Sequence, residues 1–247
     1  MNSTFYSQIN TLFLDVGNTL VAMDFPWIAK ELAYLGIACQ ARELQRAEAA
    51  ARPIISDGFK RWSTEGKDAF VFYLETVLSC LSAAVEHDSW QIKDIAQRLA
   101  PVLRPDGESD RLWSTVIPGV LESLKALKAI GFKLVAVSNS DGTVEGILVR
   151  LGIRPYFDAV YDSRLVGFEK PDPRIFLHAI EQSDADPDNT LHVGDLYNID
   201  VVGARAAGIQ AVLIDPFDDW CDVDCDRVRD LSELAGRILN FELKDQA

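Results

Sequence analysis

The sequence predicts an α/β fold in which a Rossmann-like parallel sheet core carries an inserted all-helical domain. Two observations predict the core: short apolar runs end at polar residues, and amphipathic stretches of helical length separate these runs. A third observation predicts the insertion, because between about Met23 and Leu112 the apolar residues follow helical spacing and no strand pattern occurs. We therefore expect a core formed by residues 1–22 and 113–247 and a helical domain at 23–112.

The expected strands share one design, a buried apolar run that stops at a polar residue. They are residues 12–14 before Asp15, 133–137 before Ser138, 190–193 before Gly194 and Asp195, and 210–214 before Asp215, with a weaker run at 159–161. In an open parallel sheet, ligands bind outside the carboxyl ends of the strands. We therefore expect Asp15, Ser138 and Asp195 to converge at that edge.

Amphipathic stretches account for the rest of the core and for the insertion. Core helices are expected at 120–130, 144–151, 173–181 and 199–207, several of them followed by a glycine. In the insertion, helices are expected at 28–35, 42–51, 67–86 and 89–100, and residues 57–62 are expected to form a polar, aromatic loop between two of them. This loop is a candidate for substrate selection.

Charge and composition exclude several classes of protein. The 247 residues include 24 Lys+Arg and 38 Asp+Glu, which gives a net charge of −14, and no Lys/Arg-rich run occurs. We therefore expect neither a nucleic-acid partner nor binding to an anionic membrane surface. No run of 18 apolar residues and no export leader is evident, and four scattered cysteines do not form a disulfide framework, so we expect a cytoplasmic protein.

Four short motifs follow one another along the expected core. They are Asp15-Val16-Gly17-Asn18-Thr19-Leu20, Val137-Ser138-Asn139, Lys170-Pro171-Asp172-Pro173, and Gly194-Asp195 followed by Asp200. Each motif alone has an ordinary structural explanation as a turn, a helix cap or a solvated lysine. In combination and in this order they resemble the haloacid dehalogenase-like hydrolase superfamily, and the inserted helices resemble that family's helical cap of the first type.

The resemblance implies a phosphatase-like active site. It implies that Asp15 attacks phosphorus to form an aspartyl-phosphate, and that Ser138, Asn139 and Lys170 bind the phosphate, with Ser138 and Lys170 also catalytic. The expected substrate is a small phosphorylated metabolite. Such a local cation as Lys170 would let a chain of net charge −14 bind an anion.

A divalent cation is expected at the same place, because clustered carboxylates raise one another's pKa unless a cation lies between them. Oxygen ligands favour Mg²⁺. The resemblance implies that the ion is held by the carboxylates of Asp15 and Asp195 and the backbone carbonyl of Gly17. Asp200 would support the ion from outside the ligand set or would pair with Lys170.

Gly17 departs from the family pattern. In the family's phosphatases this position holds a second Asp, which protonates the leaving group and later activates water, whereas Gly17 has no side chain. Three alternatives stay open: a phosphatase that is slow or takes its proton from the substrate or Asp24, a dehalogenase or a phosphonate hydrolase that uses Lys60 or Lys67, and a binding or regulatory protein.

The remaining polar residues have structural explanations. The run of acidic residues at 222–226 is expected to begin a helix, since Arg227 stands where a calcium loop needs Gly. Cys221 and Cys225 lack the partners of a zinc site. The three histidines are expected to be structural, with His192 in a buried strand and His87 and His178 on helices.

Overall fold

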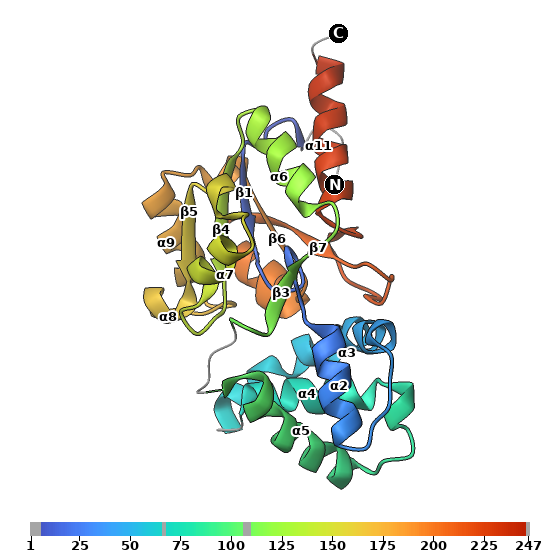
Figure 1. Ribbon diagram of the computed structural model, residues 1–247. Helices are drawn as coiled ribbons and strands as arrows, with labels where there is room; N and C mark the ends of the chain where they lie inside the picture. Colours follow the sequence, from blue (N-terminus) through green and yellow to red (C-terminus); the bar gives the residue numbers. More distant parts are fainter. Residues whose placement is uncertain (1–5, 66–67, 106–109, 246–247) are drawn as a thin grey trace. The chain divides into compact units, whose positions relative to one another are not determined.

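The computed structural model describes residues 6–65, 68–105 and 110–245, with the side chains of 59–65 and 241–245 left out. Its backbone divides into two compact units (Figure 1). The core unit comprises Met1–Ala22 and Ser114–Ala247, and the helical unit comprises Met23–Trp113.

The core unit is built on a six-stranded sheet in the order β5-β4-β1-β6-β7-β8. All of its neighbouring strands are parallel, which confirms the predicted α/β fold. Its central strand β1 lies between β4 and β6. The strands are β1 (Thr11–Leu14), β4 (Lys133–Ser138), β5 (Ala159–Asp162), β6 (Thr190–Gly194), β7 (Gln210–Ile214) and β8 (Asp226–Val228).

Helices cover the sheet because its strands are apolar on both faces. On one face Phe13, Val135 and Leu213 share a buried cluster with Phe176 and Ala204 of the covering helices α9 and α10. The core elements outside the sheet are α6 (Val120–Ala129), α7 (Val144–Arg150), η3 (Arg154–Tyr156), α8 (Ser163–Val166), α9 (Pro173–Ser183), η4 (Pro187–Asn189), the π-helix η5 (Tyr197–Val201), α10 (Val202–Ala206) and α11 (Leu231–Asp245).

The helical unit consists of α2 (Phe25–Tyr34), α3 (Ala41–Glu65), α4 (Ala69–Ser79), the short η1 (Ser82–Ala84) and α5 (Ser89–Leu103). A capping box of Asp88 and Gln91 starts α5. Inside the unit the buried carboxylate of Glu48 accepts hydrogen bonds from Arg52 and from the Tyr73 hydroxyl. Among the described residues, none of the helices is both long and apolar enough to cross a membrane.

Two expectations for the helical unit are wrong. Residues 57–62 do not form a loop, because α3 continues through Pro53 to Glu65. A proline removes only one helical hydrogen bond, and buried residues on both sides of it, among them Ala51 and Ile55, keep the helix packed. The helix expected at 67–86 is instead α4 followed by η1, because Leu81 has an extended backbone.

Two further expectations for the ends of elements are wrong. The acidic run at 222–226 does not begin a helix; its last residue starts β8, which pairs with β7. His87 lies in a bend outside any helix, whereas His178 lies in α9 as expected.

A two-stranded sheet of β2 (Val21–Met23) and β3 (Trp113–Val116) stands where the chain passes from one unit to the other. On the core side Ile117 N donates to Leu20 O at 3.0 Å. On the helical side Asp24 N donates to Leu112 O at 2.9 Å. The helical unit therefore begins and ends at two segments that are hydrogen-bonded to each other.

Candidate active site

Three neighbouring strands bring polar residues to the carboxyl edge of the sheet. Asp15 follows β1, Ser138 ends β4 and Asp195 follows β6. The backbone N–H of Asp15 donates to Val193 O at 2.8 Å, and the Ser138 hydroxyl donates to Asp15 Oδ1 at 3.2 Å. All three side chains are buried. The parallel order of the sheet therefore places these residues together although they are far apart in the sequence.

Lys170 lies at the centre of this group and is 1% exposed. Its Nζ donates to Asp15 Oδ1 and to Asp200 Oδ1, both at 2.6 Å. Of the two alternatives for Asp200, pairing with Lys170 is therefore the one that the structure displays. A buried lysine needs such partners because an unpaired buried charge is costly.

Burial and charge shift the pKa values of these three groups in different directions. Burial favours the neutral amine of Lys170, but the two carboxylates outweigh burial and raise its pKa. Burial opposes ionisation of Asp200, yet Lys170 and His192 hold the pKa of Asp200 below its usual value. For Asp15 burial prevails over Lys170 and raises the pKa. Asp15 is therefore the more basic of the two carboxylates that contact Lys170.

The two oxygens of Asp15 have different surroundings. Oδ1 accepts from Lys170 and Ser138, whereas none of the described side chains or backbone groups donates to Oδ2. Oδ2 is therefore the atom that Asp15 can offer to a ligand. The geometry leaves one carboxylate oxygen held and the other available.

Asp200 has both oxygens engaged. Oδ1 accepts from Lys170 and lies 3.0 Å from His192 Nε2, and Oδ2 accepts from Leu196 N at 2.9 Å. It lies so close to Gly194 that a Cβ there would come within 2.2 Å of Asp200 Cγ. The glycine before Asp195 is therefore required by the approach of Asp200.

His192 is the site contact that sequence reasoning did not anticipate. It is structural, as expected, but its contact with Asp200 joins it to the ion pair of Lys170 and Asp200. Burial lowers its pKa, so the imidazole is neutral and holds its Nε2 proton toward Asp200. A histidine in an apolar strand just before a Gly-Asp pair is the signal that could have identified this contact.

Asn139 contacts the backbone of Lys170. Its Nδ2 donates to Lys170 O at 2.8 Å, and Lys170 N donates to Asn139 Oδ1 at 2.7 Å. The side-chain amide of Asn139, a residue that was expected to bind phosphate, therefore already makes two hydrogen bonds within the protein.

Gly17, the candidate surrogate acid Asp24 and the lysines of the phosphonate-hydrolase alternative lie in different parts of the chain. Gly17 pairs with Val21 in an isolated bridge. Asp24 belongs to the helical unit, where its side chain accepts from Trp27 N at the start of α2. Lys67 lies outside the described residues, and Lys60 falls in α3 at a position whose side chain is not described.

The donor set fits a magnesium ion that relies on few protein ligands. In the ranges that the structure describes, no group of three or more His, Cys, Asp and Glu side chains is arranged to hold a metal. Asp15 has an oxygen available, Asp195 follows the neighbouring strand, and Gly17, two residues after Asp15, has a backbone carbonyl as its oxygen. Two carboxylates, one carbonyl and water match the oxygen ligands that Mg²⁺ prefers.

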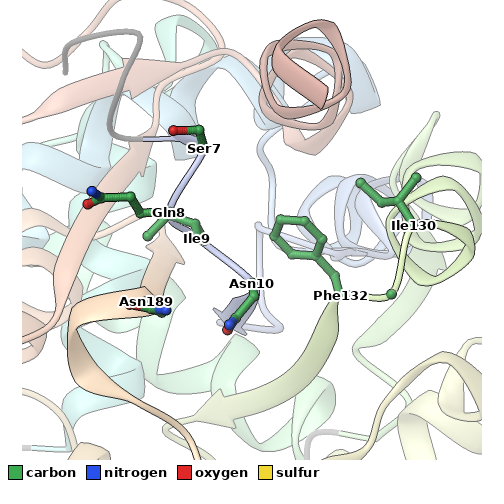
Figure 2. A pocket seen from close by; sticks show the side chains of 8 residues that line it. Ser7, Gln8, Ile9, Asn10, Ile130, Phe132 and Asn189 are labelled. Carbon is green, nitrogen blue, oxygen red and sulfur yellow. The ribbon is translucent and has the colours of Figure 1, made fainter. Parts of the chain in front are cut away.

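A separate hollow of about 590 Å³ lies at the amino ends of the strands and contains none of these residues (Figure 2). None of the described residues that line it has a charged side chain, so this lining offers no cation to a phosphate. It is lined by Ser7, Gln8, Ile9, Asn10, Ile130, Gly131, Phe132 and Asn189.

Comparisons with known proteins agree with the fold and show the family. A family model described as haloacid dehalogenase-like hydrolase matches residues 9–208. Haloacid dehalogenase-like hydrolase domain-containing protein 3 from Bos taurus is 32% identical over 212 residues, which cover 84% of this chain and 82% of that protein. A glyceraldehyde 3-phosphate phosphatase from Methanothermobacter thermautotrophicus is 39% identical over 98 residues, or 39% of this chain and 43% of that protein.

A solved structure extends the agreement in fold to most of the chain. The HAD-hydrolase YfnB from Bacillus subtilis, solved bound to magnesium, has a TM-score of 0.61 at 23% identity, covering 93% of this chain and 98% of that one. At this identity the likeness establishes the fold alone.

Proposed function

Because the chain belongs to the haloacid dehalogenase-like hydrolase family, we propose that it is a Mg²⁺-dependent phosphatase acting on a small phosphorylated metabolite. The observation that carries the proposal is the buried Lys170 ammonium, which Asp15 and Asp200 hold at the carboxyl edge of the sheet. The phosphatase named in one relative supports the same class of substrate. Lys170 gives a chain of net charge −14 a fixed positive charge for phosphate.

The first half-reaction begins at Asp15. One oxygen of the Asp15 carboxylate attacks phosphorus in line with the leaving oxygen, the P–O bond to the leaving group breaks, and an aspartyl-phosphate forms. The Ser138 hydroxyl and Lys170 ammonium donate hydrogen bonds to phosphoryl oxygens as negative charge develops there. When bound by Asp15, Asp195 and the Gly17 carbonyl, Mg²⁺ supplies further charge neutralisation. Asp200 acts by holding Lys170.

The helical unit is proposed to select the substrate. The predicted division at 23–112 places every motif residue in the core, so the chemistry needs no side chain from the inserted helices. Substrate recognition is then free to vary in the inserted segment without changing Asp15 or Lys170.

Gly17 limits which substrates react quickly. Without a carboxyl group at this position, an alkyl leaving group lacks the acid, and water in the second half-reaction lacks the base, that the family's phosphatases have there. The leaving groups of acyl and aryl phosphates depart without protonation, so these substrates should transfer their phosphate to Asp15. The same feature favours a second candidate, a binding or regulatory protein that forms the site but does not turn over.

A phosphatase panel with two variants tests the proposal. With Mg²⁺ and an aryl or acyl phosphate we expect a burst of product followed by a slow steady state, because the phosphoenzyme accumulates. Gly17→Asp should raise turnover of alkyl phosphates about 10²-fold, and Asp15→Asn should abolish both burst and turnover. If wild type and Gly17→Asp are equally inert while Mg²⁺ binds, the second candidate replaces the phosphatase. Chloroacetate in the same panel tests the dehalogenase alternative.

A further inference from the structure

We propose that Asn139 is a positioning residue that sets Lys170 for phosphate, and that its side-chain amide does not itself bind phosphate. The inference rests on the proposed function for its activity measurements. Its direct measurement concerns the Lys170 ammonium and needs no turnover.

The side chain of Asn139 makes two hydrogen bonds with the backbone of Lys170. The amide oxygen accepts from Lys170 N, and the amide nitrogen donates to Lys170 O. This reciprocal pair at 2.7 and 2.8 Å bonds both main-chain polar groups of one residue, as a neighbouring strand would. It joins the end of β4 to a segment 31 residues later in the sequence.

The position of the Lys170 ammonium depends on the position of its backbone. Nζ must reach Asp15 Oδ1 and Asp200 Oδ1 at 2.6 Å each from one backbone position. Asp15 and Asp200 hold the ammonium of Lys170, and Asn139 holds its backbone. A small displacement of the Lys170 backbone would misplace its ammonium. Such a displacement weakens the binding of the transition state far more than the binding of the substrate.

The segments that follow Asn139 and Lys170 are both held in place by the surrounding core. After Asn139, the buried Asp162 carboxylate accepts backbone hydrogen bonds from Gly142 and Val144, which holds the loop that follows β4. After Lys170, a Cβ at Gly203 would lie 2.9 Å from Pro171 Cα, so α10 is packed tightly against that segment. Two rigid segments therefore meet at the Asn139–Lys170 pair.

A direct measurement tests the pair through the lysine ammonium. In protein labelled with ¹⁵N-lysine, the Lys170 NH₃⁺ resonance is assigned by its loss in Lys170→Met. Because this ammonium is buried and doubly hydrogen-bonded, we expect slow proton exchange in wild type. Exchange should become about tenfold faster or more in Asn139→Ala, with a smaller effect in Asn139→Asp, which keeps the acceptor for Lys170 N–H. Unchanged exchange in Asn139→Ala would overturn the proposal.

A double-mutant cycle distinguishes positioning from direct binding. Asn139→Ala should lower kcat on an aryl phosphate by about 10- to 100-fold with a smaller change in KM, as two lost hydrogen bonds imply. In protein that already carries Lys170→Met, Asn139→Ala should weaken the binding of inorganic phosphate by less than about threefold. The reason is that Asn139 acts on phosphate only by positioning Lys170. An equal weakening of phosphate binding in both backgrounds identifies Asn139 as a direct ligand and refutes the proposal.

Two controls separate the possible failures. Asn189→Ala removes an asparagine side chain at the opposite edge of the sheet, in the hollow of Figure 2, and should change neither exchange nor activity. If wild type hydrolyses no phosphate ester, the proposed function fails, yet the ammonium exchange still decides the role of Asn139. If Asn139→Ala does not fold, Asn139→Asp, which lacks the donor to Lys170 O, should still show faster exchange than wild type, and unchanged exchange in that variant would overturn the proposal.

Discussion

Replacing Lys170 by Met tests the charge balance of the site most directly. The substitution keeps a long apolar side chain but removes two charge-assisted hydrogen bonds of 2.6 Å from a fully buried position. At about 1.5–3 kcal/mol each, the two bonds amount to about 3–6 kcal/mol. This range matches the cost of about 3–5 kcal/mol for removing one partner of a buried ion pair. We expect unfolding free energy to fall by about this amount at pH 7.

The penalty should depend on pH with a definite sign. In Lys170→Met the carboxyls of Asp15 and Asp200 are buried without their cation, so their folded pKa values rise above the unfolded value of about 3.9. The folded variant then binds more protons than the unfolded chain, and it gains stability as pH falls. In wild type the lowered pKa of Asp200 has the opposite effect, but the stabilisation it gives is lost only below about pH 4, where the carboxyl of the unfolded chain is protonated. The difference in unfolding free energy between wild type and Lys170→Met should therefore become smaller as the pH falls from 7 to about 4.

Urea unfolding at several pH values measures this difference, with tryptophan fluorescence as a signal because Trp220 packs in the core cluster. Lys128→Met is the matched control, since Lys128 pairs with Asp158 at the surface and should cost less than about 1 kcal/mol. A loss below 1 kcal/mol in Lys170→Met, or a penalty that does not shrink in acid, would refute the reasoning.

Three further predictions follow from the site and its surroundings. Gly194→Ala places a Cβ 2.2 Å from Asp200 Cγ and should cost about 1–3 kcal/mol or more in thermal unfolding, whereas Gly146→Ala, with nothing within 4 Å, should cost nothing. Asp195→Asn should weaken Mg²⁺ binding at least about tenfold in calorimetry, and unchanged affinity would move the ion elsewhere. Burial raises the pKa of the Cys225 thiol to about 11, so its iodoacetamide labelling should keep accelerating up to that pH; a plateau near pH 9 would contradict this.

Much of the core could be predicted because its signals are local. Each long strand is a nearly continuous apolar run, and the order of the four motifs was sufficient to identify the family that the family model confirms. The strands β2, β3 and β8 escaped prediction because each has only three or four residues and is only partly buried. The residues of β8 are a strand because they pair with β7, which is a tertiary effect.

The contacts within the site depended on geometry that no local pattern contains. That Lys170 would offset Asp15 was expected from the motifs, and the structure places the two in contact. The pairing of Asn139 with the Lys170 backbone, and the contact of His192 with Asp200, required the loops themselves. The sequence was sufficient to predict which residues share the site. It was not sufficient to predict which atoms of those residues already make hydrogen bonds within the protein.

The two-stranded sheet of β2 and β3 has a consequence for how such a chain can change. Because Asp24 and Leu112 are hydrogen-bonded, the inserted segment starts and finishes at one place, like a long loop whose ends are already closed. Joining these two points by a short turn would leave the order β5-β4-β1-β6-β7-β8 and every crossover of the main sheet unaltered. The roughly ninety intervening residues are thus topologically exchangeable, and recombination at this single point could give one catalytic sheet many different inserts.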